Sequence, residues 1–270
     1  MTGEAGVRQN CSYRRRMLPL AVVIAVIGIT LTACGSSGTS SATSSTSATS
    51  STTAGSGPNK KAMAAVLLQV SDLPSGWAES SKAQSSSTDD AAVEKVAQSI
   101  PACRAFVAQT DIDKKQTQLS SATFNDSAMP SDAANYASNQ VVGYGSEAQA
   151  KTAYAAYASS QISVCLQQVF DNLVKEQLAS INAGGGPPTV TTGGQILGVP
   201  AAGDATTAYQ IVLTIDVAGR TQKIGFVVQI ARVGQYVISY NATMYQAAPD
   251  KFGQNLVDRS VVRFGAALAA

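Results

Sequence analysis

The sequence predicts an α+β protein: a two-layer sandwich in which helices pack on one face of a twisted antiparallel sheet. Three observations lead to this class. Apolar and polar residues alternate in three consecutive runs between 209 and 244, separated by short turns that contain glycine. This pattern is typical of an antiparallel meander with one buried face. The stretch from 147 to about 180 is rich in alanine and favours helix. A last helix is expected from 250 to about 267, with Phe252, Leu256 and Phe264 toward the core.

The elements before the meander follow from local patterns. A helix is expected from 60 to 70, where apolar residues repeat at the spacing of one helical face, and Pro74 and Gly76 favour a turn after it. A short helix is expected over 91–99, ended by Pro101. The segments 116–124 and 136–144 are predicted as strands. Together with the meander, they supply the sheet.

The alanine-rich helix has a recognisable start. Ser146 is a favourable N-cap, and Gln149 stands three residues later, as in a capping box. A break is expected near residues 159–160. Cys165, Val169 and Leu173 are four residues apart, so the spacing predicts that they share the buried face of the second half.

The N-terminus has the features of a secretory signal. An apolar run from 17 to 33 follows three arginines and ends in small residues just before Cys34. This arrangement resembles the lipobox of bacterial lipoproteins, in which the peptide is cleaved before the cysteine and the sulfur is acylated. The alternative is a membrane-spanning anchor, but the run is shorter than such a helix needs and contains a proline. We therefore expect a signal peptide over 1–33 and a lipid on Cys34.

The chain after Cys34 divides into a tether and one domain. Residues 36–57 are Ser, Thr, Gly and Ala only, too polar and small to form a core. We expect a disordered, lipidated tether over 34–57 and an extracytoplasmic domain over 58–270, long enough for one core. Loss of 1–33 removes four arginines and one glutamate from 19 basic and 17 acidic residues, which leaves a net charge of −1. This balance gives no reason to expect nucleic acid as a partner.

Two cysteines remain in the expected domain, Cys103 and Cys165. In an oxidising compartment, such a pair usually forms one disulfide. A redox-active pair is the alternative, but it lacks the local Cys-x-x-Cys spacing that lowers a thiol pKa.

The order of these parts resembles a known family. The first helix, followed by Asp72-Leu73-Pro74-Ser75-Gly76-Trp77, is similar to the opening of many actinobacterial lipoproteins. The strand that ends Val141-Val142-Gly143-Tyr144, the helix leading to Cys165 and the closing meander resemble the extracellular sensor domain of PknH-type serine/threonine kinases. The resemblance implies a two-layer sandwich with a groove proposed to bind a ligand. The family often has a tryptophan before the helix cysteine and two disulfides, which this chain does not have.

The chain contains no histidine, which excludes histidine-based triads, ligands and pH sensing. No serine-hydrolase or phosphate-loop signature is present either, so we expect no catalytic residue, no metal and no cofactor. The carboxylates at 89–90 and at 111 and 113 are interpreted as solvated loop residues, with a metal or acid–base pair as the alternative. Trp77 and Tyr144 are the candidates for ligand contact, and anchoring of a loop or a sheet edge is the structural alternative for both. Three further tyrosines join Tyr144 in a predicted cluster at the strand-to-helix junction: Tyr136, Tyr154 and Tyr157.

These features predict a lipoprotein held on the outer face of the cell membrane by the lipid on Cys34. Its domain is expected to be a non-catalytic sensor that holds a small cell-envelope molecule or a protein partner. Two alternatives stay open: a carrier of a lipid or glycolipid, which needs a deep apolar cavity, and an enzyme built on paired carboxylates.

Overall fold

The computed structural model describes residues 57–80, 87–126, 135–178, 189–217, 220–245 and 252–269. The predicted signal peptide, the predicted lipidation site Cys34 and all of the predicted tether except Gly57 lie outside the described residues.

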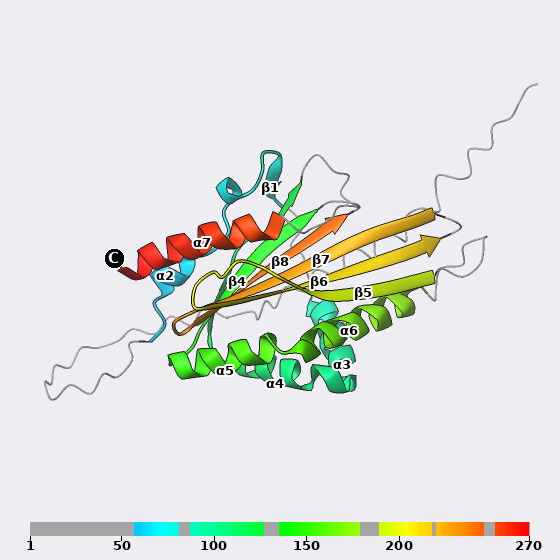
Figure 1. Ribbon diagram of the computed structural model, residues 1–270, viewed down its shortest axis with the longest axis horizontal. Coiled ribbons are helices and arrows are strands. Elements are labelled where there is room, and N and C mark those ends of the chain that lie inside the picture. The colour runs from blue at the N-terminus through cyan, green and yellow to red at the C-terminus, as the bar shows by residue number, and fades with distance from the viewer. Residues whose placement is uncertain are drawn as a thin grey trace, which may run out of the picture.

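The described residues form one antiparallel sheet of eight strands (Figure 1). The main path runs in the order β1-β3-β4-β8-β7-β6-β5, and β2 pairs with β4 beside β3. The three longest strands are the predicted meander, which is confirmed, and neighbouring strands stay in register over most of their length. The strands are β1 (Trp77–Glu79), β2 (Thr117–Ser120), β3 (Phe124–Asp126), β4 (Tyr136–Gly143), β5 (Thr189–Leu197), β6 (Ala205–Val217), β7 (Arg220–Val233) and β8 (Tyr236–Tyr245).

Helices cover the sheet, so the predicted α+β sandwich is confirmed. Figure 1 shows α3 to α6 together along one side of the sheet, and α7 with α2 on another. None of the described helices is both long and apolar enough to cross a bilayer. The helices are α2 (Lys60–Ala65), α3 (Ser87–Ser99), α4 (Arg104–Asp113), α5 (Glu147–Tyr157), α6 (Ser160–Leu178) and α7 (Phe252–Ala269), with two 3₁₀ turns, η2 (Val70–Asp72) and η3 (Pro101–Cys103).

The first face of the sheet packs against α5 and α6. Side chains of β6 and β7 that point to this face, such as Ile211 and Phe226, are buried in one apolar cluster with both helices. The rings of Phe170 on α6 and Phe226 on β7 stack with centroids 4.6 Å apart. The predicted N-cap is confirmed, because the Ser146 hydroxyl accepts a hydrogen bond from the backbone N–H of Gln149 at 3.3 Å.

The second face is also covered, which extends the predicted arrangement of helices on one face. Successive residues of a strand point to opposite faces. On β8, Val237 belongs to the first core, whereas Ile238 and Tyr240 belong to a second core with α2 and α7. Phe264 of α7 is buried there as predicted, with its ring edge against Tyr236, and the side chains of Phe252 and Leu256 lie outside the described residues. The sequence prediction missed this second layer because it assigned the apolar residues of β7 and β8 to one core, whereas Phe226 and Ile238 point to opposite faces.

Polar side chains tie this second layer together. Arg263 of α7 forms a bidentate ion pair with the buried carboxylate of Asp72, and it also donates to the carbonyl oxygens of Ala65 and Leu67. Asn139 of β4 accepts from the N–H of Leu68 at 2.8 Å and donates to the carbonyl oxygen of Val66 at 2.9 Å. The end of α2 is therefore hydrogen-bonded both to the sheet and to the last helix.

One helix is shorter than expected, the strand expected over 116–124 is divided into β2 and β3, and β1, α4 and β5 were not predicted. The helix expected over 60–70 ends at Ala65, and Val70 lies exposed in η2. The long helix breaks at residues 158–159 as predicted and continues as α6 to Leu178. The sequence prediction missed α4 and β5. The paired glycines Gly193 and Gly194 hide β5, because glycine disfavours strand.

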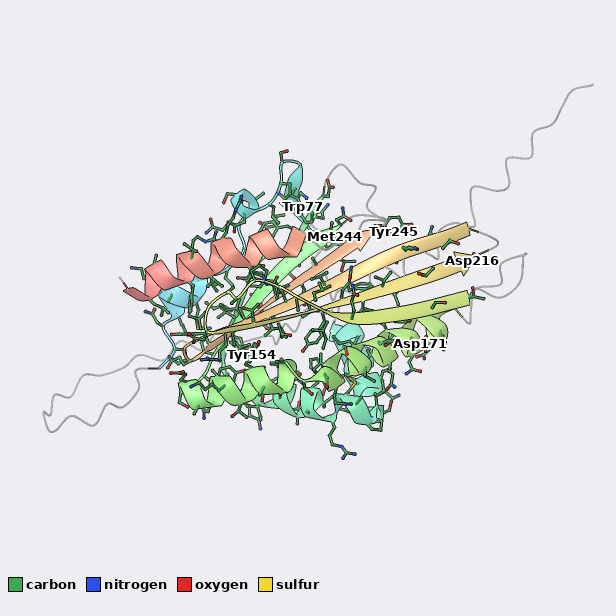
Figure 2. All side chains as sticks on the ribbon, viewed as in Figure 1. Trp77, Tyr154, Asp171, Asp216, Met244 and Tyr245 are labelled. Carbon is green, nitrogen blue, oxygen red and sulfur yellow. A yellow bond between two sulfur atoms is a disulfide. The ribbon has the colours of Figure 1, made fainter. Side chains whose placement is uncertain are left out.

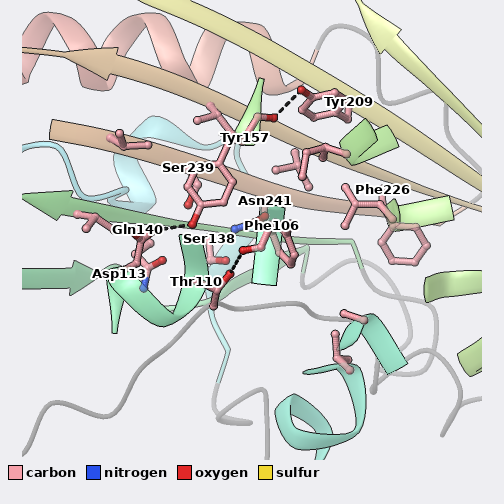
Figure 3. Close-up of a pocket in the computed structure, with 18 of the residues that line it drawn as sticks. Phe106, Thr110, Asp113, Ser138, Gln140, Tyr157, Tyr209, Phe226, Ser239 and Asn241 are labelled. Carbon is pink, nitrogen blue, oxygen red and sulfur yellow. Dashed lines mark hydrogen bonds between the residues drawn. The ribbon is translucent and has the colours of Figure 1, made fainter. Parts of the chain in front are cut away.

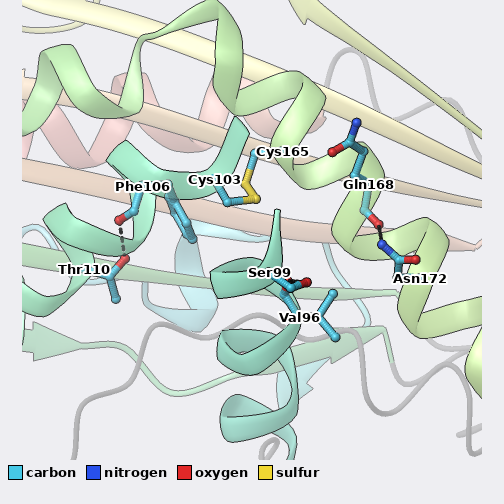
Figure 4. The surroundings of a disulfide bond; sticks show 8 residues. All are labelled: Val96, Ser99, Cys103, Phe106, Thr110, Cys165, Gln168 and Asn172. Atoms are coloured by element: carbon cyan, nitrogen blue, oxygen red, sulfur yellow. Dashed lines mark hydrogen bonds between the residues drawn. A yellow bond between two sulfur atoms is a disulfide. The ribbon is translucent and has the colours of Figure 1, made fainter. Parts of the chain in front are cut away.

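The disulfide expected between Cys103 and Cys165 is present in the structure (Figure 4). It joins η3 to the middle of α6. Both cysteines are fully buried in a third cluster with Ile100, Val169 and Leu173. The bond thereby ties the α3–α4 layer to α6, with Val169 and Leu173 on the same helical face as Cys165, as their spacing predicts.

Candidate ligand-binding cleft

A cleft lies between the first face of the sheet and the helices above it (Figure 3). Its volume is about 190 Å³. Strands β4, β8 and β7 form the floor, and α3, α4 and α6 form the roof. The antiparallel register of the floor and the disulfide in the roof determine which side chains face the cavity.

The roof and one side of the floor are apolar. Phe106 of α4 and Leu166 and Phe170 of α6 line the roof. On β7, alternate residues point upward, namely Phe226, Val228 and Ile230. These residues offer carbon surface, and this part of the cleft would accommodate an apolar ring or chain.

The other side of the floor carries a stripe of uncharged polar side chains. The register places Ser138 of β4 opposite Asn241 of β8 and Gln140 opposite Ser239, and directly opposed residues point to the same face. Gln140 donates to the side-chain oxygen of Gln118 at 3.1 Å. In the part of the chain that the structure describes, the side chains of Ser138, Ser239 and Asn241 form no hydrogen bond. These four residues, Ser138, Gln140, Ser239 and Asn241, are called the polar stripe below.

At one wall of the cleft, the buried carboxylate of Asp113 forms a cluster with three hydrogen-bond donors. Asp113 ends α4, is only 6% exposed and accepts three hydrogen bonds. Gln109 Nε2 donates to Oδ1 at 2.6 Å, Tyr144 donates to the same oxygen at 2.7 Å, and Tyr157 donates to Oδ2. Burial raises the pKa of the Asp113 carboxyl above its usual value of 3.8, while the hydrogen bonds from Tyr157, Tyr144 and Gln109 oppose this shift.

This cluster corrects the interpretation of Asp113 as a solvated loop residue. The sequence around Asp113 is polar, and nothing local marks it as buried. Its partners Tyr144 and Tyr157 come from the end of β4 and from α5, 31 and 44 residues further along the chain. Burial raises the pKa of the Tyr157 hydroxyl well above its usual value, and the negative charge of Asp113 raises it further. This tyrosine therefore stays a hydrogen-bond donor.

The rim of the cleft carries an exposed group of charges. Lys114 Nζ lies 2.9 Å from a carboxylate oxygen of Glu94 and 3.2 Å from one of Asp111. The hydrogen bond with Glu94 is the main cause that raises the pKa of Lys114. Asp111 is exposed, as expected of a solvated carboxylate, but it lies in α4 and not in a loop, and its neighbour Lys114 is a cation that is already paired. The carboxylates at 89–90 likewise lie in α3 and not in a loop, and their side chains lie outside the described residues.

The two candidates for ligand contact do not lie on the cleft. Trp77 is 8% exposed and packs in the second core, and Figure 2 shows it at the start of β1, on the side of α7. Tyr144 is 1% exposed and does not line the cavity, but it donates to Asp113, which does. Of the other tyrosines in the predicted cluster, Tyr136 and Tyr157 line the cleft, whereas Tyr154 packs beside the first core. The predicted cluster is therefore divided among three places.

Sequence reasoning missed the polar stripe, although a signal for it exists. The alternation in β8 was interpreted as apolar residues toward the core and polar residues toward solvent. In the structure, Ser239 and Asn241 point under the helices instead and line the cleft together with Ser138 and Gln140 of β4. Within the described residues, no group of three His, Cys, Asp or Glu side chains is arranged to hold a metal ion.

Comparison with known proteins gives one likeness of fold. No protein-family model matches the chain, and no curated protein matches it. Among solved structures, the chain is similar to the crystal structure of the extracellular domain of PknH from Mycobacterium tuberculosis. The identity is 13% and the TM-score is 0.38, over 80% of this chain and 99% of that chain. A likeness at this level carries no functional conclusion, so the function depends on the residues of this chain.

Proposed function

We propose that this protein is a non-catalytic binding domain, held by a lipid on Cys34 at the outer face of the cell membrane, whose cleft holds a small molecule. The cleft carries the proposal. Three side chains of the polar stripe, those of Ser138, Ser239 and Asn241, form no hydrogen bond with any described residue, and they lie under an apolar roof. Such a site gains most when a bound molecule supplies the missing hydrogen bonds.

Binding without catalysis fits the charges around the cleft. Glycoside hydrolysis, the acid–base chemistry typical of paired carboxylates, uses two carboxyl groups on either side of the scissile bond. Asp113 is the buried carboxylate here, and three donors already occupy its oxygens. Glu94 and Asp111 lie at the rim beside Lys114. This arrangement favours a positioning role for Asp113, which holds the end of α4 against α5.

The size of the cleft favours a small molecule over a carried lipid. Pockets for drug-sized ligands measure roughly 300–1,000 Å³, whereas this cavity measures about 190 Å³. A carrier of lipid or glycolipid would need a deeper apolar chamber for its acyl chains. The lining also includes a polar stripe, which long acyl chains would leave without partners.

The disulfide supports export, since such bonds persist in oxidising compartments. The test of the anchor is fractionation of cells that express the wild-type chain or Cys34→Ala, together with mass spectrometry of the N-terminus. We expect a diacylglyceryl group on Cys34 and an uncleaved precursor in the variant. An unmodified Cys34 in the exported protein would remove the anchor from the proposal.

The test of the cleft is native mass spectrometry of the protein purified from its own membrane. We expect a bound small molecule that is lost from Ser239→Phe, which fills the cavity from its floor. Ser99→Phe is the matched control, because Ser99 is exposed at the end of α3. An adduct that survives Ser239→Phe would show that the molecule binds elsewhere.

A further inference from the structure

We propose that the cleft selects an uncharged ligand, with an apolar body beneath the helices and hydrogen-bonding groups along the edge that faces the polar stripe. This inference rests on the proposed function of the cleft and adds the chemical class of the ligand. It follows from three properties of the lining: the capacity of the stripe for hydrogen bonds, the pairing of the charges, and the size of the apolar part.

The polar stripe can both donate and accept. A serine hydroxyl is donor and acceptor, and the Asn241 amide offers a carbonyl oxygen and an NH₂ group. Ser138 and Asn241 lie directly opposite each other, with Ser239 two residues before Asn241 on the same face of β8. A ligand group that both donates and accepts, such as an amide or a hydroxyl, matches these three side chains.

Among the described residues that line the cleft, no charge is available to neutralise a charged ligand. The lining contains four charged side chains, three of them acidic, and the lysine is held by Glu94 and Asp111. An anion would meet the carboxylate of Asp113 and find no free cation. A cation would compete with the three donors that Asp113 already has. Burial of a charge without a partner is costly, so both classes are disfavoured.

The apolar part fits a single ring. A cavity of roughly 150 Å³ lined by aliphatic and aromatic side chains accommodates benzene, and this cleft measures about 190 Å³. Phe106, Phe170 and Phe226 supply ring faces and edges around it. Benzamide, benzoate and benzylammonium therefore make a matched set of probes: they share the ring and differ in charge.

The experiment measures the dissociation constant of each probe by saturation-transfer NMR with the full chain in lipid nanodiscs, and empty nanodiscs serve as the blank. We expect benzamide to bind about tenfold or more tightly than either charged probe, because each charge would be desolvated without a partner. Benzoate or benzylammonium binding as tightly as benzamide would overturn the ligand class while leaving the cleft as a site. Binding of none of the three would remove the cleft itself, and with it the proposed function.

A pair of asparagine variants tests whether the amide group of benzamide contacts the polar stripe. Asn241→Leu removes hydrogen-bonding capacity from the stripe and keeps the number and branching of the side-chain heavy atoms, so benzamide should lose most of its advantage over the charged probes. Asn172→Leu is the matched control, because Asn172 is exposed on α6 and contacts only the carbonyl oxygen of Gln168. Equal benzamide affinity in both variants would place the amide away from the stripe and overturn the inference.

Discussion

The two faces of the sheet differ in whether the polar side chains beneath the helices have hydrogen-bond partners. On the second face, Asp72 pairs with Arg263, and Asn139 bridges the sheet to the end of α2. On the first face, Ser138 and Asn241 lie beneath the helices, and their side chains form no hydrogen bond to any described residue. Strand β4 supplies residues to both sets from alternate positions, Ser138 to the first face and Asn139 to the second. One face thus uses polar groups to hold elements together, and the other leaves them available to a ligand.

This contrast separates stability from binding. Polar groups that are paired inside a protein are costly to disturb, because the partner is left buried and unsatisfied. Polar groups that have no partner stabilise nothing in the free protein. Substitutions on the second face should therefore lower the free energy of unfolding, and those in the polar stripe should change ligand binding with little effect on folding.

The largest effect is expected from loss of the disulfide, which holds the cleft-side helices. The bond closes a loop with a sequence separation of 62 residues, and in the chain-entropy model this closure stabilises the fold by about 4 kcal/mol. The double variant Cys103→Ala, Cys165→Ala should lose about this amount in chemical denaturation. Hydrogen exchange should rise in α3 and α4 before it rises in α2 and α7. Uniform exchange across both faces would contradict this order.

Arg263→Met should follow, with a loss of about 3 kcal/mol in the free energy of unfolding, because it leaves the buried carboxylate of Asp72 without its partner. Arg259→Met is the control, since Arg259 is exposed and makes one long hydrogen bond to the carbonyl oxygen of Asp72. Benzamide affinity should be unchanged in both variants under folding conditions. Equal stability of the two variants would show that the ion pair contributes little.

A pair of asparagines compares the faces directly. Asn139→Leu should cost about 2 kcal/mol, because it leaves the Leu68 N–H and the Val66 carbonyl unpaired. Asn241→Leu should change stability by no more than about 0.5 kcal/mol. Both values come from urea denaturation of otherwise identical chains. A similar loss in both variants would abolish the distinction between the two faces.

The smallest effect concerns pH and Asp113. Its pKa is raised in the folded protein, so the folded state binds a proton at higher pH than the unfolded chain does. Stability contributed by this group therefore rises as the pH falls from neutral toward the usual aspartate value of 3.8. Asp113→Asn should remove that component, which appears as a difference between the two pH profiles of unfolding. If the wild-type and Asp113→Asn profiles are parallel, the effects of burial and of hydrogen bonding on the pKa of Asp113 cancel, which would contradict this prediction.

The sequence was informative where the signal is local. The meander follows from alternation, the start of α5 from Ser146, and the buried position of Cys165 from its spacing with Val169 and Leu173. Each of these depends on residues within one element or one turn. The overall class followed from their order along the chain.

The parts that were missed depend on contacts between distant segments. Asp113 is buried only because Tyr144 and Tyr157 reach it from other elements, and the polar stripe becomes a cleft floor only because α4 and α6 cross above it. Trp77 shows the opposite error, because a residue predicted to contact a ligand lies in a core. A lone tryptophan beside a turn is compatible with ligand contact, but the packing of β1 buries it in the second core.

The pairing of Asp72 with Arg263 has a consequence for how the chain matures. The two residues are 191 positions apart, and Phe264 completes the same core. A polypeptide that emerges from a pore N-terminus first delivers these last side chains at the very end. The α2 side of the sheet therefore stays uncovered, and accessible to water and to protease, until Arg263 and Phe264 have emerged. A chain truncated before Arg263 would leave that side of the sheet without its cover.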